Sequence, residues 1–307
     1  MSFDIIGDIH GCSKTLERLL TKLGYSRDTE GVFRHPDRTV IFLGDFIDRG
    51  PHQRAVISIV RPMIDTGAAK SVMGNHEYNA IAYATPDEEA GGFLRAHSAN
   101  NLRQHGVFLD AYADDPDAYR ALIEWFKALP LWLDLGDLRI IHACWDREII
   151  QRLTAPVLTD DLLRASSGKG QWEFEAIETI LKGKEVPLPD GHMFHDKDGN
   201  ARHHIRIRWW DRSATTYALA FFGPESARTH IPDDEIDGDH LIEYSHEEPP
   251  LFLGHYWMEG VPEPLAPNIA CMDYSVAKEG GKLVAYRWDG EQDLSRKKFV
   301  AVERLEP

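Results

Sequence analysis

The chain has 307 residues, of which 50 are Asp or Glu and 34 are Lys or Arg, so the formal net charge is −16 with the 15 histidines counted as neutral. Nonspecific affinity for nucleic acids comes from clustered Lys and Arg side chains, so this balance argues against a broadly basic DNA- or RNA-binding protein. The 43% hydrophobic and 27% charged residues are typical of a folded globular protein rather than a disordered, collagen-like or membrane-embedded chain.

The N-terminus has no basic region ahead of an apolar segment, and no apolar run approaches the roughly 18 residues that a membrane-spanning helix needs. We therefore expect a soluble, cytoplasmic protein with no membrane partner. The length fits two domains or one large α/β domain that carries an insertion.

Strand and helix patterns alternate through the first half of the chain. Apolar segments at residues 3–6, 39–43 and 71–73 predict strands. Helices are expected from Leu16 to Gly24 and from Pro51 to Gly67, with Pro62 kinking the second helix or ending it early. Helical patterns follow at residues 88–105 and 117–129, and residues 131–135 and 138–141 predict paired strands. This alternation favours an α/β fold.

Residues 146–250 differ in character from the rest of the chain. Helical patterns around 159–182 precede a Pro- and Gly-rich turn at 187–191, a polar run at 195–202 and an acidic segment at 233–240. We interpret this stretch as an insertion, or cap, within a single domain of residues 1–307. After it, residues 251–253, 268–272 and 282–288 predict strands, with a hairpin turn at residues 280–281.

At five points an apolar run ends directly in a residue that can bind a metal ion. The segments are Gly7-Asp8-Ile9-His10, Gly44-Asp45, Gly74-Asn75-His76, His142 and Gly254-His255. In open α/β sheets, sites form beyond the carboxyl ends of the strands, so we expect these side chains to converge. Carboxylate, imidazole and amide groups together suit manganese, iron or zinc better than a calcium cage or a thiolate site. Any one of these residues alone would more often be a cap, turn or core residue.

The same segments resemble the motifs of the calcineurin-like metallophosphoesterases, and specifically of their phosphoprotein-phosphatase branch. In chain order, the matching blocks are Gly7-Asp8-Ile9-His10-Gly11, Gly44-Asp45-Phe46-Ile47-Asp48-Arg49-Gly50, Gly74-Asn75-His76-Glu77, His142 and Gly254-His255. They cover residues 3 to about 145 and 251 to 288, so the middle third has no counterpart. The segments at residues 8–12, 22–25 and 35–38 are most similar to bacterial members related to symmetrical dinucleoside tetraphosphatases and to the phosphatase modules of RNA-repair enzymes.

The resemblance implies a β-sandwich flanked by helices, with residues 146–250 as a cap beside the site. It also implies a centre of two divalent metal ions, with manganese preferred and iron, zinc, nickel or cobalt as alternatives. A hydroxide that bridges the two ions would attack phosphorus in line, and the ions would supply the local positive charge that the acidic chain lacks. The implied ligands are Asp8 and His10 for the first ion, Asp45 as the bridge, and Asn75, His142 and His255 for the second.

The resemblance further implies a catalytic dyad, in which His76 protonates the leaving oxygen and Asp48 orients His76. Arg49 would bind phosphate oxygens, although Asp48 and Arg49 could instead form an ion pair at a helix start. A second phosphate-binding arginine has only two approximate candidates, Arg206 and Arg208, which could equally lie on a basic strand face.

One block departs from the family pattern, and the role of three tryptophans stays open. The late Asp-Thr-Gly block of the family is Asp273-Tyr274-Ser275 in this chain. Three tryptophans, Trp209, Trp210 and Trp257, are either core residues or a platform on which bases stack, with the core favoured for the first two.

The sequence thus predicts an enzyme that hydrolyses phosphate esters or anhydrides in a metal-dependent reaction. Three substrate classes remain open: a dinucleoside polyphosphate or nucleotide, a Ser/Thr phosphoprotein, and an RNA end. The net charge weighs against long nucleic acids and favours small phosphorylated partners. A binding protein that has lost activity is less favoured, because all six ligand positions and the His76, Asp48 and Arg49 positions are filled.

Overall fold

The computed structural model describes residues 2–195, 201–223, 225–238 and 241–307. In this part of the chain, the larger sheet has six strands in the order β14-β15-β1-β4-β5, with β16 paired to β15. Strands β1, β4 and β5 are parallel, whereas β15 runs antiparallel to β1, so that Ile5 lies between Ile41 and Tyr286. The bounds are β1 Ser2–Ile6, β4 Arg38–Phe42, β5 Ala69–Ser71, β14 Asp273–Tyr274, β15 Lys282–Trp288 and β16 Phe299–Glu303.

A second, four-stranded sheet has the order β13-β12-β7-β6. Its strands are β6 Trp132–Asp134, β7 Arg139–Ile141, β12 Leu251–Leu253 and β13 Ile269–Cys271. β7, β12 and β13 are parallel, and β6 pairs antiparallel with β7 through a turn in which Gly136 has a φ of 82°. The predicted strand pair is therefore confirmed.

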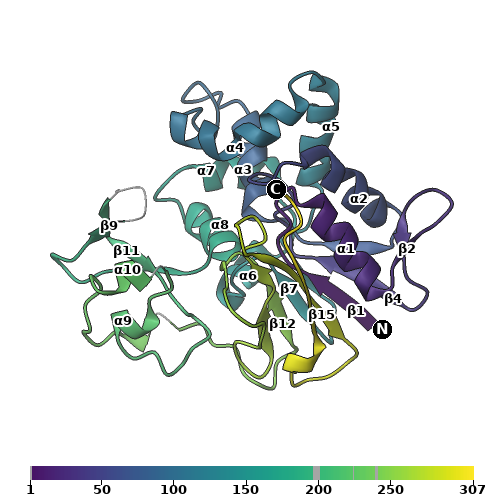
Figure 1. Cartoon of the computed structure of the whole chain (residues 1–307). Coiled ribbons are helices and arrows are strands. Elements are labelled where there is room, and N and C mark those ends of the chain that lie inside the picture. Colours follow the sequence, from purple (N-terminus) through teal and green to yellow (C-terminus); the bar gives the residue numbers. More distant parts are fainter. Residues whose placement is uncertain (1, 196–200, 224, 239–240) are drawn as a thin grey trace.

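The two sheets pack against each other through a core of their own. Phe3, Ile5 and Ile41 of the larger sheet belong to one buried cluster with Ile140 and Phe252 of the smaller sheet. Side chains one position further along the strands point the other way, because successive side chains of a strand alternate between its faces. Ile6 and Phe42 accordingly belong to a different cluster, together with apolar residues of the first two helices. The predicted α/β class is confirmed, and the arrangement is a β-sandwich flanked by helices (Figure 1).

The first two helices agree with the amphipathic pattern except at their ends. Helix α1, Ser13–Leu23, ends at Gly24, whose φ of 95° is left-handed. Helix α2, Gln53–Asp65, begins two residues after Pro51 and continues for three residues past Pro62. The helix therefore does not stop at Pro62, because so close to the C-terminal end a proline removes little of the hydrogen-bond ladder, although it ends two residues before Gly67. The alternative of a kink at Pro62 stays a prediction. Strand β5 also lies two residues earlier than predicted.

The predicted helix at residues 88–105 is wrong over its first half. The Asp87 carboxylate instead accepts hydrogen bonds from the backbone N–H groups of residues 89 and 90, and Gly91 and Gly92 both have positive φ, which breaks a helix. Helix α4 begins only at Ala99, where the Ser98 side chain caps the N–H of residue 101.

Several helices lie around the sandwich. None of those in the described residues combines the length and the apolar character that crossing a membrane requires. Their bounds, besides α1 and α2, are α3 Asn75–Ala84, α4 Ala99–Tyr112, α5 Pro116–Lys127, α6 Arg147–Leu153, α7 Asp160–Ser167, α8 Trp172–Lys182, α9 Tyr217–Ala220, α10 Glu225–Arg228 and the 3₁₀ helix η2 Arg296–Lys298.

The segment between β7 and β12 leaves the smaller sheet and returns to it, since these two strands pair with each other. Its later part, which carries β9, β11, α9 and α10, lies to one side of the sandwich (Figure 1). Residues 196–200 of the predicted polar run and 239–240 of the acidic segment lie outside the described residues. The single-domain organisation with an insertion at 146–250 stays a prediction. The short strands, which form two-stranded antiparallel pairs, are β2 Ser26–Arg27, β3 Phe33–Arg34, β8 Glu185–Pro187, β9 Phe194–His195, β10 Ala201–Arg202 and β11 His204–Arg206.

Tyr256 joins this segment to the smaller sheet. Its hydroxyl donates to the carbonyl of Ala143 (3.1 Å) and accepts from the indole N–H of Trp209 (2.9 Å). Trp209 is fully buried, and the ring of Trp210 packs edge-on against the ring of Tyr256. Trp209 is therefore a core residue, and the neighbouring Trp210 packs against this core. Because Tyr256 directly follows His255, the same contact fixes the backbone of a predicted metal ligand.

Replacing Tyr256 with Phe removes both hydrogen bonds of the hydroxyl and leaves the Trp209 N–H buried without its acceptor. We expect the free energy of unfolding to fall by about 1–3 kcal/mol, measured by urea denaturation. Tyr217→Phe, a half-buried tyrosine on α9, is the matched control. Equal stability of the two variants would show that the Tyr256 hydroxyl does not anchor the segment.

Candidate metal centre

All six predicted ligands lie at the carboxyl ends of parallel strands, four from the larger sheet and two from the smaller sheet. Asp8 and His10 follow β1, Asp45 follows β4, and Asn75 opens α3 just after β5. From the smaller sheet, His142 follows β7 and His255 follows β12. Each of these side chains is buried.

Asp45 is at the middle of the group. Its Oδ2 atom lies 3.6 Å from His10 Nε2, 3.5 Å from His142 Nε2 and 3.9 Å from His76 Nε2. Its Oδ1 atom accepts the backbone N–H of His76 at 2.9 Å. Two sets of donor atoms share this carboxylate, because His10, Asp45 and His76, and likewise Asp45, His142 and His255, have ligand atoms within 4.8 Å of one another.

The histidines turn Nε2 toward the centre. A carbonyl oxygen can only accept, so His10 Nδ1 donates to Ile47 (2.9 Å) and His142 Nδ1 donates to Leu43 (2.6 Å), which leaves the Nε2 atom of each ring facing the centre. Within the described residues, His10 Nε2, His255 Nε2 and Asp8 Oδ1 are buried with no hydrogen-bond partner. Buried polar atoms normally have one, so this donor set fits divalent metal ions.

Asn75 lies between the two histidines of the second set. Its Oδ1 atom is 2.7 Å from His255 Nδ1 and 3.1 Å from His142 Nε2. Burial and the positive charge of Arg206 hold the pKa of His255 well below its ordinary value, so this imidazole is neutral and able to act as a ligand.

The glycines before the ligands are required mainly by close approach. A Cβ atom at Gly254 would lie 2.1 Å from Asp8 Oδ1, and one at Gly74 would lie 2.2 Å from Asp45 Oδ1. Neither of these two glycines has a positive φ, whereas Gly44 does (87°). The left-handed conformation falls instead on the functional positions themselves, where strain is held by the surrounding structure. These residues are His10, Asp45, Asp48, Arg49 and His255.

Asp48 is held between two histidines. His76 Nδ1 lies 2.5 Å from Asp48 Oδ2, and His105 Nδ1 lies 2.8 Å from Asp48 Oδ1. Burial would raise the pKa of Asp48, but the hydrogen bonds from His105 and His76 hold it well below its ordinary value. Burial would likewise lower the pKa of His76, but the carboxylates of Asp45 and Asp48 raise it. His76 is therefore suited to hold and donate a proton.

Arg49 does not pair with Asp48 in the described part of the chain, which removes the alternative of an ion pair at a helix start. Its guanidinium Nη2 instead lies 3.5 Å from His76 Nε2, and its Cζ lies 4.0 Å from the centre of the Trp257 ring. The side chain is exposed at the rim of the centre, where a phosphate oxygen can reach it.

The two arginine candidates have different surroundings. Arg206, on β11, has an Nη2 atom 3.5 Å from a carboxylate oxygen of Glu185, and its charge acts on His255. Arg208 lies beside Phe222, with its Cζ 5.9 Å from the ring centre. Of the two, Arg206 is the one whose charge acts on a predicted metal ligand.

Two further residues were missed by the sequence reasoning. His105 lies within the predicted 88–105 helix, but its partner Asp48 is 57 positions away, and no local pattern joins them. Glu77 is fully buried, and its carboxylate accepts the backbone N–H groups of Asp45 (2.7 Å), Phe46 (2.8 Å) and Gly74 (3.1 Å). The signal for Glu77 was its place as the last residue of the Gly74-Asn75-His76-Glu77 block.

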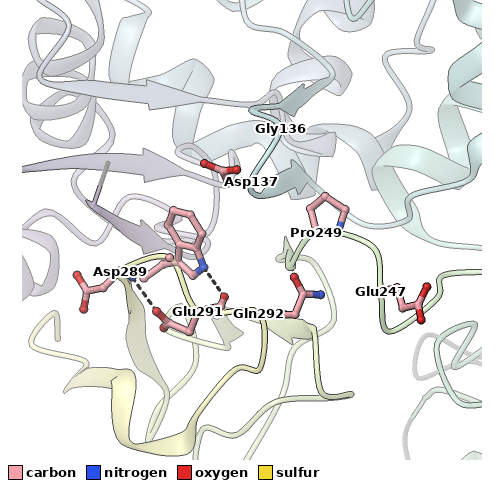
Figure 2. Close-up of a pocket in the computed structure, with 9 residues that line it drawn as sticks. Gly136, Asp137, Glu247, Pro249, Asp289, Glu291 and Gln292 are labelled. Atoms are coloured by element: carbon pink, nitrogen blue, oxygen red, sulfur yellow. Dashed lines mark hydrogen bonds between the residues drawn. The ribbon is translucent and has the colours of Figure 1, made fainter.

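A separate pocket of about 380 Å³ lies at the opposite, amino ends of the parallel strands (Figure 2). It is formed between the turn before β7 and the end of β15, and Trp288 donates its indole N–H to the carbonyl of Glu291 there (2.9 Å). None of the predicted site residues lines this pocket. Its four acidic lining residues are Asp137, Glu247, Asp289 and Glu291.

Comparison with known proteins agrees with the geometry of the centre. A family model described as calcineurin-like phosphoesterase matches residues 1–250. The chain belongs to this family. Calcineurin-like phosphoesterases use divalent metal ions, and the buried His and Asp groups described above could hold them.

The relatives with curated names match only part of the chain. The bis(5'-nucleosyl)-tetraphosphatase PrpE [asymmetrical] of Geobacillus thermodenitrificans is 48% identical over 170 residues, which are 52% of this chain and 64% of that protein. The protein of the same name from Halalkalibacterium halodurans is 49% identical over 77 residues, which are 25% of this chain and 31% of that protein. The chain thus spans less than two thirds of the length of these relatives, whose names specify asymmetrical enzymes, whereas the sequence motifs were most similar to symmetrical ones.

A solved structure shows likeness over the whole chain. The protein serine/threonine phosphatase from Saccharomyces cerevisiae with similarity to human phosphatase PP5 superposes with a TM-score of 0.53 at 16% identity, covering 100% of this chain and 81% of that one. At this identity, the likeness concerns the fold alone.

Glu77 makes the stability of the metal-free protein depend on pH. Burial and the charge of Asp45 raise its pKa from 4.5 to about 7, so the folded state holds this proton more tightly than the unfolded state does. The resulting stabilisation is fully present below pH 4.5 and is lost as the pH rises through about 7. We expect the Tm of the wild type to fall relative to that of Glu77→Gln, which cannot titrate, across this interval.

The measurement is differential scanning calorimetry of both proteins in a chelator at several pH values. Glu88→Gln, at an exposed position, is the control and should follow the wild type at every pH. A difference in Tm between wild type and Glu77→Gln that does not change with pH would contradict the assignment.

Proposed function

We propose that the chain is a metal-dependent hydrolase of phosphate esters or anhydrides, and that its substrates are dinucleoside polyphosphates. One observation carries the reaction type: the buried Asp45 carboxylate has metal-binding donor atoms on both sides, and the His76–Asp48 pair stands directly beside it. This combination of a shared ligand and a protonated histidine suits the transfer of a phosphoryl group to water.

The proposed ligands divide into two sets that share Asp45. Asp8, His10 and Asp45 would hold one divalent ion, and Asp45, Asn75, His142 and His255 would hold the other. When bound, the ions neutralise charge on the phosphoryl oxygens and lower the pKa of a water molecule. Carboxylate, imidazole and amide donors without thiolate suit manganese, iron or zinc, and we propose manganese.

The residues around the ions have separate tasks in this proposal. His76 donates its proton to the leaving oxygen, because the carboxylates of Asp45 and Asp48 favour its charged form. Asp48 holds the ring in place through the 2.5 Å contact with Nδ1, so that Nε2 faces the centre. Arg49 at the rim, with Arg206 as the second arginine, would orient phosphate oxygens through the planar guanidinium.

The proposed substrate class rests on the named relatives and on charge. The relatives from Geobacillus thermodenitrificans and Halalkalibacterium halodurans are both named bis(5'-nucleosyl)-tetraphosphatases. The net charge of −16 disfavours long RNA, which has one negative charge per nucleotide. The likeness to a serine/threonine phosphatase concerns the fold, so it does not favour a phosphoprotein. A cytoplasmic location and a cap role for residues 146–250 stay predictions.

The reaction is tested with the purified full chain by metal analysis and by turnover with added Mn²⁺. We expect about two divalent ions per chain and hydrolysis of p-nitrophenyl phosphate. His76→Ala should retain the metal but lose about 10²–10⁴-fold in kcat on an unactivated alkyl phosphate, whose leaving oxygen needs a proton. The loss on p-nitrophenyl phosphate should be smaller, because its leaving group is stable without one.

The controls separate the reaction from the substrate. If the wild type binds no metal and shows no turnover with any divalent ion, the proposal that the chain is an enzyme is contradicted. Turnover of diadenosine tetraphosphate compared with a phosphopeptide and a 3′-phosphorylated nucleotide tests the substrate class, and a preference for either of the latter would overturn it.

His105 should contribute by holding Asp48 in line with His76. His105→Ala removes the 2.8 Å hydrogen bond to the carboxylate, and we expect kcat to fall about tenfold, as for a lost hydrogen bond to a charged group, with KM unchanged. His105→Asn keeps an N–H donor near the position of Nδ1 and should recover much of the loss. His246→Ala, an exposed histidine, is the control, and steady-state kinetics would contradict the role if all three variants matched the wild type.

A further inference from the structure

Three side chains form a continuous row at the rim of the metal centre. The guanidinium of Arg49 and the ammonium of Lys278 both lie over the indole ring of Trp257, at 4.0 Å and 4.2 Å from its centre. The row begins at the reaction centre, because Arg49 is 3.5 Å from His76 and the Trp257 ring is 6.4 Å from the ring of His10. Among the described contacts, Arg49 touches both His76 and Trp257, whereas Lys278 touches Trp257 alone of these two.

Three loops carry this row, and one buried carboxylate joins the two that carry Trp257 and Lys278. Asp273 accepts the backbone N–H of Trp257 (2.8 Å) with one oxygen and that of Ser275 (2.9 Å) with the other. Its own carbonyl accepts the N–H of Met258 (2.9 Å). Trp257 and Ser275 both have left-handed backbones, with φ of 50° and 59°. Asp273 thus holds the two loops in a conformation that they would not adopt alone.

The same contacts run through the Asp273-Tyr274-Ser275 block, in which Asp273 is the residue shared with the family pattern. Ser275 begins the turn that carries Lys278, and the N–H of Lys278 donates to the Ser275 carbonyl (2.8 Å). Asp273 therefore places the indole and the lysine relative to each other, although it touches neither side chain's charged or aromatic end.

Among the described residues, the cations of this row have no direct carboxylate partner, although buried carboxylates such as Asp45 and Asp273 act on Arg49 from a distance. In the described part of the chain, neither Arg49 nor Lys278 forms an ion pair with a carboxylate, although acidic residues outnumber basic ones by 50 to 34. Both cations lie over the same indole, and each is attracted by its ring. Trp257 is thus engaged by cations and is not a free platform for a base.

We propose that Arg49 and Lys278 bind successive phosphate groups of a phosphate chain that extends beyond the hydrolysed group, with Trp257 as the spacer between them. The inference rests on the proposed function and specifies how its substrate is recognised. A phosphate monoester reaches Arg49 only, whereas a chain of three or more phosphates reaches Lys278. The ligand chemistry is a linear polyphosphate, carried by a nucleotide or free.

The test compares substrates with one phosphate and with several. Lys278→Ala should lower kcat/KM about tenfold for inorganic tripolyphosphate and for diadenosine tetraphosphate, as expected for a lost charge-assisted contact. kcat/KM for p-nitrophenyl phosphate should not change, which also shows that the variant is folded and loaded with metal. Lys278→Arg keeps the cation and should retain most of the activity, and Lys297→Ala, on η2, is the matched control for loss of one exposed lysine.

The outcomes separate this inference from the proposed function. If the wild type hydrolyses these substrates and Lys278→Ala changes kcat/KM for none of them, the phosphate-binding role of Lys278 is overturned while the proposed function stands. A loss confined to diadenosine tetraphosphate also overturns it, since the lysine would then recognise the nucleoside. If the wild type hydrolyses nothing, the proposed function fails, and calorimetric binding of tripolyphosphate to the Mn²⁺-loaded protein decides the subsite: equal Kd values for wild type and Lys278→Ala overturn it.

Discussion

The burial of one carboxylate, Asp45, constrains the rest of the site. Burial would raise the pKa of Asp45, yet the surrounding His142 and His76 rings hold it well below its ordinary value, so it is charged in the interior. A buried charge is tolerated only where opposite charges and hydrogen bonds surround it. The histidines from both sheets, the N–H of His76 and two divalent ions would together meet that requirement.

The sandwich makes this arrangement possible, because strands from both sheets end at the same edge. The ligands come from five separate strands or strand ends, and the glycines at positions 74 and 254 let two of these backbones approach the carboxylates more closely than any other residue would allow. Glu77 then ties the loops after β4 and β5 together, and Asp273 does the same for the loops after β12 and β14. Two buried carboxylates that need not touch metal thus hold in place the residues that would.

Much of the fold could be predicted because its signals are local. Each signal, such as the hydrophobic period of β1, α1 or β4 or the turn at Gly136, is carried by residues only a few positions apart. The 88–105 prediction failed because side-chain hydrogen bonds at Asp87 and two left-handed glycines outweighed an apolar pattern that resembled a helix. The path of residues 146–250 was not predictable, since its packing depends on distant partners such as the Tyr256–Trp209 contact.

The chemical groups present, their order along the chain and the apolar strands that precede them can be read from the sequence, because these are properties of neighbouring residues. Which of these groups meet depends on how the chain folds. The contacts of Asp48 with His105 and of Trp257 with Arg49 and Lys278 join residues from separate loops and helices. Such contacts depend on distance and direction in space, on which neither composition nor spacing carries information.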